Sequence, residues 1–185
     1  MGRVSLPNLE YYEGDANLIL AIDNAIRLKE VKLCWDSEDD AQIDRIIIGL
    51  SSMTKSDIPV VSSHVYPDDP FQIVTSVSKH MRNAQTLGLA SLRDCIELLS
   101  RDTIHHITGC LQRLTSLAYL EISSYPATPG DMAEDLITVQ TWGEVCATLK
   151  ACCFNRRGWS KVDGRWEEFP ILEFRVLAGL SGTFY

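Results

Sequence analysis

The sequence predicts an α/β fold of the leucine-rich-repeat type, a solenoid or horseshoe in which strand–helix units stack and parallel strands line the concave face. Two observations predict it. A template with apolar residues at its first, fourth and sixth positions recurs along the chain, and the segments between its copies have the 3.6-residue apolar period of helices. Because each helix returns the chain to the same edge, neighbouring strands must be parallel. We therefore expect one leucine-rich-repeat-like domain over residues 1–185.

Five copies of the template predict strands near 6–12, 28–34, 58–63, 84–90 and 117–123. The copies starting at Leu6, Leu28 and Leu117 are the clearest, and those starting at Ile58 and Ala84 are weaker. Their starts lie 22, 30, 26 and 33 residues apart, whereas leucine-rich repeats have a period of about 20 to 29. The predicted repeat is therefore irregular.

Four helices are expected between these strands. Their predicted starts are acidic or proline-rich: Asp36 or Ser37, the turn 67–70, Asp102 or Thr103, and Thr138. Residues 18–26 are compatible with a short additional helix at the beginning. The apolar stripes that define the four helices are Ile43, Ile46, Ile47 and Leu50; Phe71, Val74, Val77 and Met81; Ile104, Ile107, Leu111 and Leu114; and Val139, Trp142, Val145, Cys146 and Leu149.

The pattern changes in the last part of the chain, where we expect a cap over about 154–185. Residues 155–158 form a polar turn, and apolar residues then alternate with charged ones up to Pro170, which predicts one or two strands. A terminal repeat needs such a cover for its open side. The apolar segment 171–180 fits a helix or a strand equally well.

Composition excludes several classes of protein. The net charge of −8 disfavours binding to nucleic acid or to an anionic membrane surface. No apolar run reaches the roughly 18 residues of a membrane span, and the first ten residues lack the apolar region of a secretory signal. The six cysteines have no C-x-x-C spacing, so we expect buried, reduced thiols and an intracellular location, cytoplasmic or nuclear.

Candidate chemistry is sparse, and we expect no catalytic residue, metal or cofactor. His106 and Cys110 share a helix face, but two ligands do not make a zinc site. The acidic residues from Asp36 to Asp40 lack the glycine and the final carboxylate of a calcium loop. A Cys–His hydrolase built from Cys34, His64 and His80 would need a fold that brings the three together.

The residues between the apolar template positions are expected to face the concave side, because side chains of a strand alternate. We predict that this face binds a protein partner with a basic patch, since it carries tyrosines and more acidic than basic groups. The same rule places Asn8, Cys34, Val60, Ser62, Gly88 and Ser123 there. The predicted binding residues are Glu10, Tyr12, Glu30, Lys32, Thr86, Tyr119 and Glu121.

Several stretches resemble the C-terminal region of mushroom-type fungal F-box proteins. The segment 6–14 is similar to the LPxLxxYxG opening of that region, and 110–114, 120–122, 142–146 and 164–166 are similar to later parts of it. The resemblance implies a leucine-rich-like horseshoe that recruits the substrate of a ubiquitin ligase adaptor. The F-box itself is lacking before the first strand, so docking to the ligase scaffold is not expected.

Two alternatives remain open at this point. A doubly wound sheet would reverse its strand order and would carry a glycine-rich turn after the first strand, which 11–16 is not. An α/β enzyme with an unrecognised site would have a pocket with converging titratable groups at the carboxyl ends of its strands. Strands that neighbour one another in chain order would favour the binding module.

Overall fold

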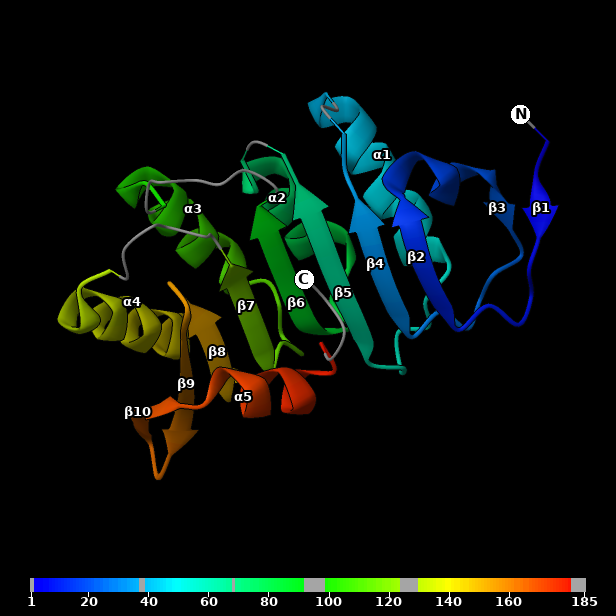
Figure 1. The fold of residues 1–185 in the computed structure, drawn as a ribbon. Coiled ribbons are helices and arrows are strands. Elements are labelled where there is room, and N and C mark those ends of the chain that lie inside the picture. The colour runs from blue at the N-terminus through cyan, green and yellow to red at the C-terminus, as the bar shows by residue number, and fades with distance from the viewer. Residues whose placement is uncertain (1, 37–38, 68, 92–98, 124–129, 181–185) are drawn as a thin grey trace.

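The computed structural model describes residues 2–36, 39–67, 69–91, 99–123 and 130–180. Its centre is an open eight-stranded sheet with β10 and β2 at its edges (Figure 1). From β2 to β8 the strands are parallel and neighbour one another in chain order, and β8, β9 and β10 are antiparallel. The strands are β2 (Tyr11–Asp15), β4 (Glu30–Cys34), β5 (Val60–Tyr66), β6 (Ala84–Ser91), β7 (Tyr119–Ser123), β8 (Ala151–Phe154), β9 (Arg157–Val162) and β10 (Arg165–Phe169), with β1 (Val4–Ser5) and β3 (Ile22–Asp23) paired separately.

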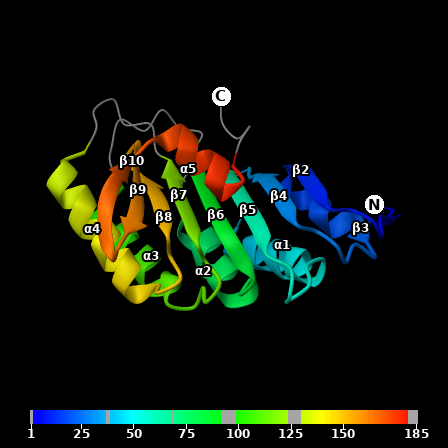
Figure 2. The same cartoon turned by 90° about the horizontal axis from the view of Figure 1, so that it is seen from below.

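The connections between the parallel strands lie on one face of the sheet. The 3-10 helix Ala16–Ala21 follows β2, and four α-helices follow the later strands. The last helix, α5 (Ile171–Ala178), lies on the other face (Figure 2). The prediction of an α/β fold is therefore confirmed, with a mixed and mostly parallel sheet. The four helices are α1 (Asp40–Ser52), α2 (Phe71–His80), α3 (Arg101–Leu111) and α4 (Met132–Val145).

The main core lies between the sheet and α1–α4. Three of the five template copies point into it as predicted, those that start at Leu28, Ala84 and Leu117. The helices contribute most of the stripes expected from their period, and neighbouring helices contact one another along the array. The expectation for Phe71 was wrong, because this first residue of α2 lies outside the core and is exposed. Strands contribute Val31, Leu33, Leu87, Leu89, Leu120 and Ile122, and helices contribute Ile46, Ile47, Leu50, Val74, Val77, Ile107, Leu111, Val139 and Trp142.

The start of α2 directly after Pro70 confirms the prediction from the turn 67–70. The other three helices start at residues that differ from the predicted ones, because the side chains that cap them lie elsewhere. Asp39, Ser100 and Asp131 each accept a hydrogen bond from a backbone N–H of the first turn of α1, α3 and α4. The prediction that Thr138 caps the fourth helix is wrong: its Oγ1 donates to the Glu134 carbonyl inside α4. Asp102 and Thr103 likewise lie inside α3, and 37–38 lie outside the described residues.

Two template copies have the opposite register to the predicted one. In β2, Tyr12 packs against the core and Tyr11 is exposed. In β5, which begins at Val60, the side chains of Val60 and Ser62 point to the face covered by α1–α4, and the side chain of Val61 points to α5. A shift by one residue moves every side chain of a strand to the other face, so the expected positions of Tyr12, Val60 and Ser62 on the concave side were wrong.

The C-terminal part adds a strand that the sequence did not reveal, β8, and then folds back. Asn155 and Arg156, both with positive φ of 48° and 64°, form a two-residue turn from β8 to β9. After β10 the chain crosses to the other face as α5. There Phe174 and Ala178 form a second, small core with Ala151 and Cys153 of β8.

Candidate functional site

The sheet face opposite α1–α4 is divided into an open and a covered part. α5 lies over β8 and β9, and its end reaches β6 through the bond from Thr86 Oγ1 to the Ala178 carbonyl, 2.8 Å. Beside it, the outward side chains of β2 and β4 are at least partly exposed. We call this second part the open strip; its residues are Tyr11, Glu13, Glu30, Lys32 and Cys34.

The open strip contains a connected set of charged and phenolic groups. Lys32 Nζ lies 2.7 Å from Glu13 Oε1, and the Tyr11 hydroxyl donates to the other oxygen of Glu13. The hydrogen bonds from Lys32 and Tyr11 lower the pKa of Glu13. The bond to Glu13 raises the pKa of Tyr11 to about 12, and the charge of Glu30 acts in the same direction. The strip therefore holds two carboxylates beside one ammonium group.

The covered part contains three of the predicted binding residues. Thr86 and Glu121 are 1% and 0% exposed, and Tyr119 is half-buried against the second core. Arg175 of α5 donates to Glu121 Oε1 from Nη2 at 2.8 Å and from Nε at 3.1 Å. These residues lie on the predicted face of the sheet. The expectation that a partner binds them there was wrong, because helix α5 covers this part of the face.

The other predicted residues are divided between surfaces. Glu30 and Lys32 lie on the open strip, and Tyr12 faces the core. Glu10 is exposed just before β2, where its carboxylate lies 3.0 Å from Lys29 Nζ. Tyr11 and Glu13 were not among the predicted binding residues, because the adjacent Tyr11 and Tyr12 fit either register of the strand. The pairing of Tyr11 with Glu30 shows which register the strand has.

A cavity of about 570 Å³ lies between the N-terminal halves of α3 and α4, at the carboxyl end of β8. Its volume falls in the range of small-molecule sites. Acidic, basic and apolar side chains contribute to its wall. They are Leu99, Arg101, Ile104, His105, Thr108, Gly130, Asp131, Glu134, Asp135, Ile137, Thr138, Thr141, Phe154 and Asn155.

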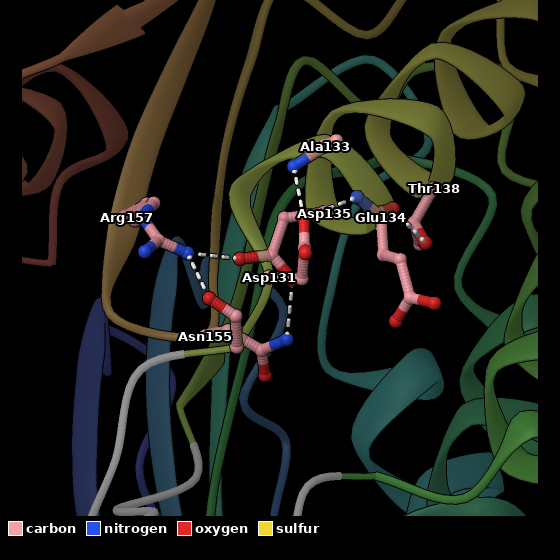
Figure 3. A network of polar contacts seen from close by, with 8 residues as sticks. Asp131, Ala133, Glu134, Asp135, Thr138, Asn155 and Arg157 are labelled. Carbon is pink, nitrogen blue, oxygen red and sulfur yellow. Dashed lines mark hydrogen bonds and ion pairs between the residues drawn. The ribbon is translucent and has the colours of Figure 1, made fainter.

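The buried carboxylate of this cavity belongs to a polar network that joins α4 to the β8–β9 turn (Figure 3). Asp135 accepts from Asn155 Nδ2 at 2.7 Å and from Arg157 Nη1 at 2.6 Å. Arg157 Nη1 also donates to the Gly130 carbonyl at 2.8 Å. The network satisfies a carboxylate that is 2% exposed, which accounts for its position without a ligand.

The threonine hydroxyls of the cavity are bound within their own helices. Thr108, Thr138 and Thr141 each donate to the carbonyl four residues earlier. Thr108 Oγ1 also accepts from Trp142 Nε1 at 3.0 Å. None of these three hydroxyls donates to a histidine or carboxylate, so the geometry does not activate them as nucleophiles.

The histidines and cysteines suggested by the sequence do not converge. His64 is buried and accepts from Trp35 Nε1 at its Nδ1, 3.1 Å, whereas Cys34 points to the opposite face of the sheet. His106 stacks on Phe71. Among the described residues, no three His, Cys, Asp or Glu side chains are grouped as metal ligands. Cys95 lies outside the described residues; the other five cysteines are free thiols, buried except for Cys34.

Comparisons with models of known families, with curated proteins and with solved structures found no match to the chain. Within the described part of the chain, no helix combines the length and the apolar character needed to span a bilayer.

Proposed function

We propose that the chain is a protein-binding module, built as a leucine-rich-repeat-like solenoid, whose partner docks on the sheet face opposite α1–α4. The observation that carries this proposal is the strand order. Six parallel strands follow one another from β2 to β8 without a reversal, and α1–α4 cover a single face. A doubly wound enzyme places its ligand where the strand order reverses, whereas a solenoid leaves one face available to a partner.

The open strip supports a partner with a basic patch. The two negative charges of Glu13 and Glu30 outnumber the single positive charge of Lys32, and Tyr11 offers a large aromatic surface beside them. Tyrosines are enriched among the residues that dominate binding energy, and complementary charge accelerates association and selects the partner.

The resemblance to mushroom-type fungal F-box proteins extends this proposal. The partner would be the substrate of a ubiquitin ligase adaptor, and the chain would supply the recruiting region. A cytoplasmic or nuclear location belongs to the same proposal, and the five free thiols of the described residues support it because reducing compartments keep thiols reduced.

Charge reversal on the open strip tests the proposal. The variant Glu13→Lys/Glu30→Lys changes the strip alone, and Asp57→Lys/Glu144→Lys makes the same charge change at exposed positions elsewhere. Each protein is used for affinity purification from cell extract with quantitative mass spectrometry, after circular dichroism has shown equal melting. We expect the wild type and the control to enrich the same partner and the strip variant to lose it. Equal recovery by all three would refute the proposal.

A ligand-binding or enzymatic role is the second candidate, and the cavity between α3 and α4 favours it. Glu134 and His105 contribute titratable groups there, as the enzyme alternative requires. A fragment screen by NMR would test it, with Thr138→Trp as the variant that fills the cavity. Fragments that bind the wild type and not this variant would support the second candidate, and an absence of such fragments would exclude it.

A further inference from the structure

Helix α5 has its apolar and charged sides inverted relative to an ordinary surface helix. Leu172, Val176 and Leu177 are 73%, 69% and 56% exposed. We call these three residues the α5 ridge. A surface helix normally directs its apolar stripe to the core and its charged side to solvent. Here the buried side carries only Phe174 and Ala178, so most of the large apolar side chains of α5 point outward.

The side of α5 that faces the sheet carries a charged residue, Arg175, where a surface helix would normally carry an apolar one. Arg175 reaches inward to Glu121, which is fully buried. The sheet surface below is itself polar, with Thr86 bonded to the last turn of α5 and Ser123 bonded to Glu121. The contact between α5 and the sheet therefore consists of polar bonds, all of those to Glu121 being made at Oε1 while its Oε2 is buried without a partner among the described residues, and of a small core that contains none of the ridge residues.

The ridge groups three exposed apolar side chains on a single helix. The other large exposed apolar residues are distributed over several separate elements, and single ones of that kind are ordinary. On α5 they form the wall of a shallow groove of about 380 Å³. The groove is lined by Phe169, Leu172, Glu173, Val176 and Leu177. A grouped apolar surface with a polar rim marks an interaction site.

α5 lies on the sheet face opposite α1–α4 (Figure 2), and the open strip is formed by the side chains of β2 and β4 on that same face. Gly179, at the end of α5, lies beside Val61 of β5, and β5 is the direct neighbour of β4. One partner can therefore contact both surfaces at once. This continuity connects the ridge to the face already proposed for binding.

The charges around the ridge define the partner. Glu173 is the charged residue of the groove. On the same side of β10 as Phe169, the exposed side chains of Glu167 and Arg165 carry opposite charges. Arg175, the basic residue of α5, is engaged by Glu121. With Glu173 in its wall and the carboxylates of the open strip on the same sheet face, the apolar groove fits an apolar helix face flanked by lysine or arginine.

We propose that the α5 ridge is the docking site for a basic amphipathic helix of the partner protein. This inference rests on the proposed function and adds the surface that supplies most of the affinity. The ridge side chains insert between the apolar residues of the partner helix, and its basic residues pair with Glu173 and with the open strip. Association then buries apolar surface that α5 leaves in water.

A designed peptide tests this directly by fluorescence anisotropy. It has 18 residues, with leucines at i, i+3, i+4 and i+7 and lysines elsewhere; one control peptide has the same composition in scrambled order, and another has glutamate in place of lysine. We expect micromolar binding of the first peptide and at least tenfold weaker binding of both controls. No binding of the first peptide, or equal binding of the glutamate peptide, overturns the proposal.

Matched variants locate the binding site. Leu172→Asp/Val176→Asp should weaken binding at least tenfold, and Glu173→Lys several-fold with a smaller dependence on salt. Ile48→Asp/Met132→Asp places the same change at exposed positions of α1 and α4, away from α5, and should bind as the wild type does. Equal affinity of the ridge variant and this control overturns the proposal, as would binding of the wild type, but not the ridge variant, to neutral phosphatidylcholine vesicles.

Sedimentation and affinity purification separate the remaining outcomes. A wild-type dimer that the ridge variant abolishes would identify a second copy of the chain as the occupant and would refute the basic helix. In the purification, a partner that is lost by the open-strip variant and retained by the ridge variant refutes this inference while the proposed function stands. A partner retained by both refutes the two together.

Discussion

Arg175 of α5 and Glu121 of β7 form an ion pair between two elements that are 54 residues apart in the chain. Nη2 of the arginine lies 2.8 Å from Oε1 of a carboxylate that no solvent reaches. Ser123 donates to the same oxygen at 2.7 Å. The pair attaches α5 to the sheet and is the reason that a predicted binding residue is buried.

Removal of the arginine should destabilise the protein more than removal of the pair. Arg175→Met leaves the Glu121 carboxylate buried and unpaired, and we expect a loss of about 3 kcal/mol in the free energy of unfolding. The double variant Glu121→Gln/Arg175→Met should recover most of that loss. Urea denaturation of the four proteins of this cycle measures it. Strictly additive effects would show that the two side chains do not depend on each other.

Two helical glycines should respond to alanine in opposite directions. A Cβ on Gly143 of α4 would lie 2.6 Å from Trp166 Nε1, so Gly143→Ala must displace the indole, and we expect a loss of about 1 to 3 kcal/mol. A Cβ on Gly109 of α3 meets nothing within 4 Å. Gly109→Ala should therefore add up to about 1 kcal/mol through helix propensity. Thermal and urea unfolding measure both, and a stabilised Gly143→Ala would contradict the close contact.

The turns of the two C-terminal hairpins each contain a residue with positive φ, which is an arginine in one turn and a glycine in the other. Arg156 has φ of 64° in the turn after β8, and Gly164 has φ of 82° in the turn after β9. Arg156→Gly should stabilise the protein by about 1 kcal/mol, because it relieves a left-handed conformation in a non-glycine residue. Gly164→Arg should destabilise it by a similar amount. Equal signs for the two substitutions in chemical denaturation would count against this account of the turns.

The buried His64 should make the protein less stable in mild acid. Burial lowers its pKa to about 3 from an ordinary value of 6.5. Between these values the unfolded chain binds a proton that the folded chain does not, so stability is complete above pH 6.5 and falls as the pH decreases towards 3. Between pH 6.5 and pH 5 we expect a loss of about 2 kcal/mol from this group.

A histidine-free variant checks the source of that dependence. His64→Phe removes the titrating group, and His105→Gln removes an exposed histidine from α3 as the control. Urea denaturation at pH 7 and pH 5 should show the acid loss in the wild type and the control, and a much smaller one in His64→Phe. An unchanged loss in His64→Phe would assign the effect to other groups.

The parts of the fold that the sequence predicted are those in which one face of an element is continuously apolar. The template copies at Leu28, Ala84 and Leu117 bury the residues expected of them, and so do the helical stripes at most of their positions. Phe71 is an exception, because it is 42% exposed and stacks on His106. The copy at Ile58 failed because the polar residues Ser62 and His64 are buried and bond to each other, 2.9 Å apart. The copy at Leu6 failed because Tyr12 and not Tyr11 packs against the core. The apolar period of a sequence does not reveal a strand face whose polar side chains are buried because they are hydrogen-bonded.

The candidate site was predicted only in part. Glu30 and Lys32 lie on an exposed sheet face as expected, since β4 alternates cleanly between Val31 and Leu33 inside and charged residues outside. Thr86 and Glu121 are on that face but covered by α5, and the α5 ridge itself was not foreseen. An apolar segment such as 171–180 does not specify which of its apolar residues the fold will cover.

Local sequence pattern was enough to predict the α/β class, the alternation of strands and helices from β4 to α4, and the apolar sides of most of these elements. These follow from the periods of 2 and 3.6 residues, which any chain of this pattern must satisfy locally. Three features became evident only from the packing of the folded chain: α5 crosses to the other face, Glu121 is buried beneath it, and Leu172, Val176 and Leu177 remain exposed. Such outcomes depend on contacts between residues far apart in the chain, and local periodicity contains no information about them.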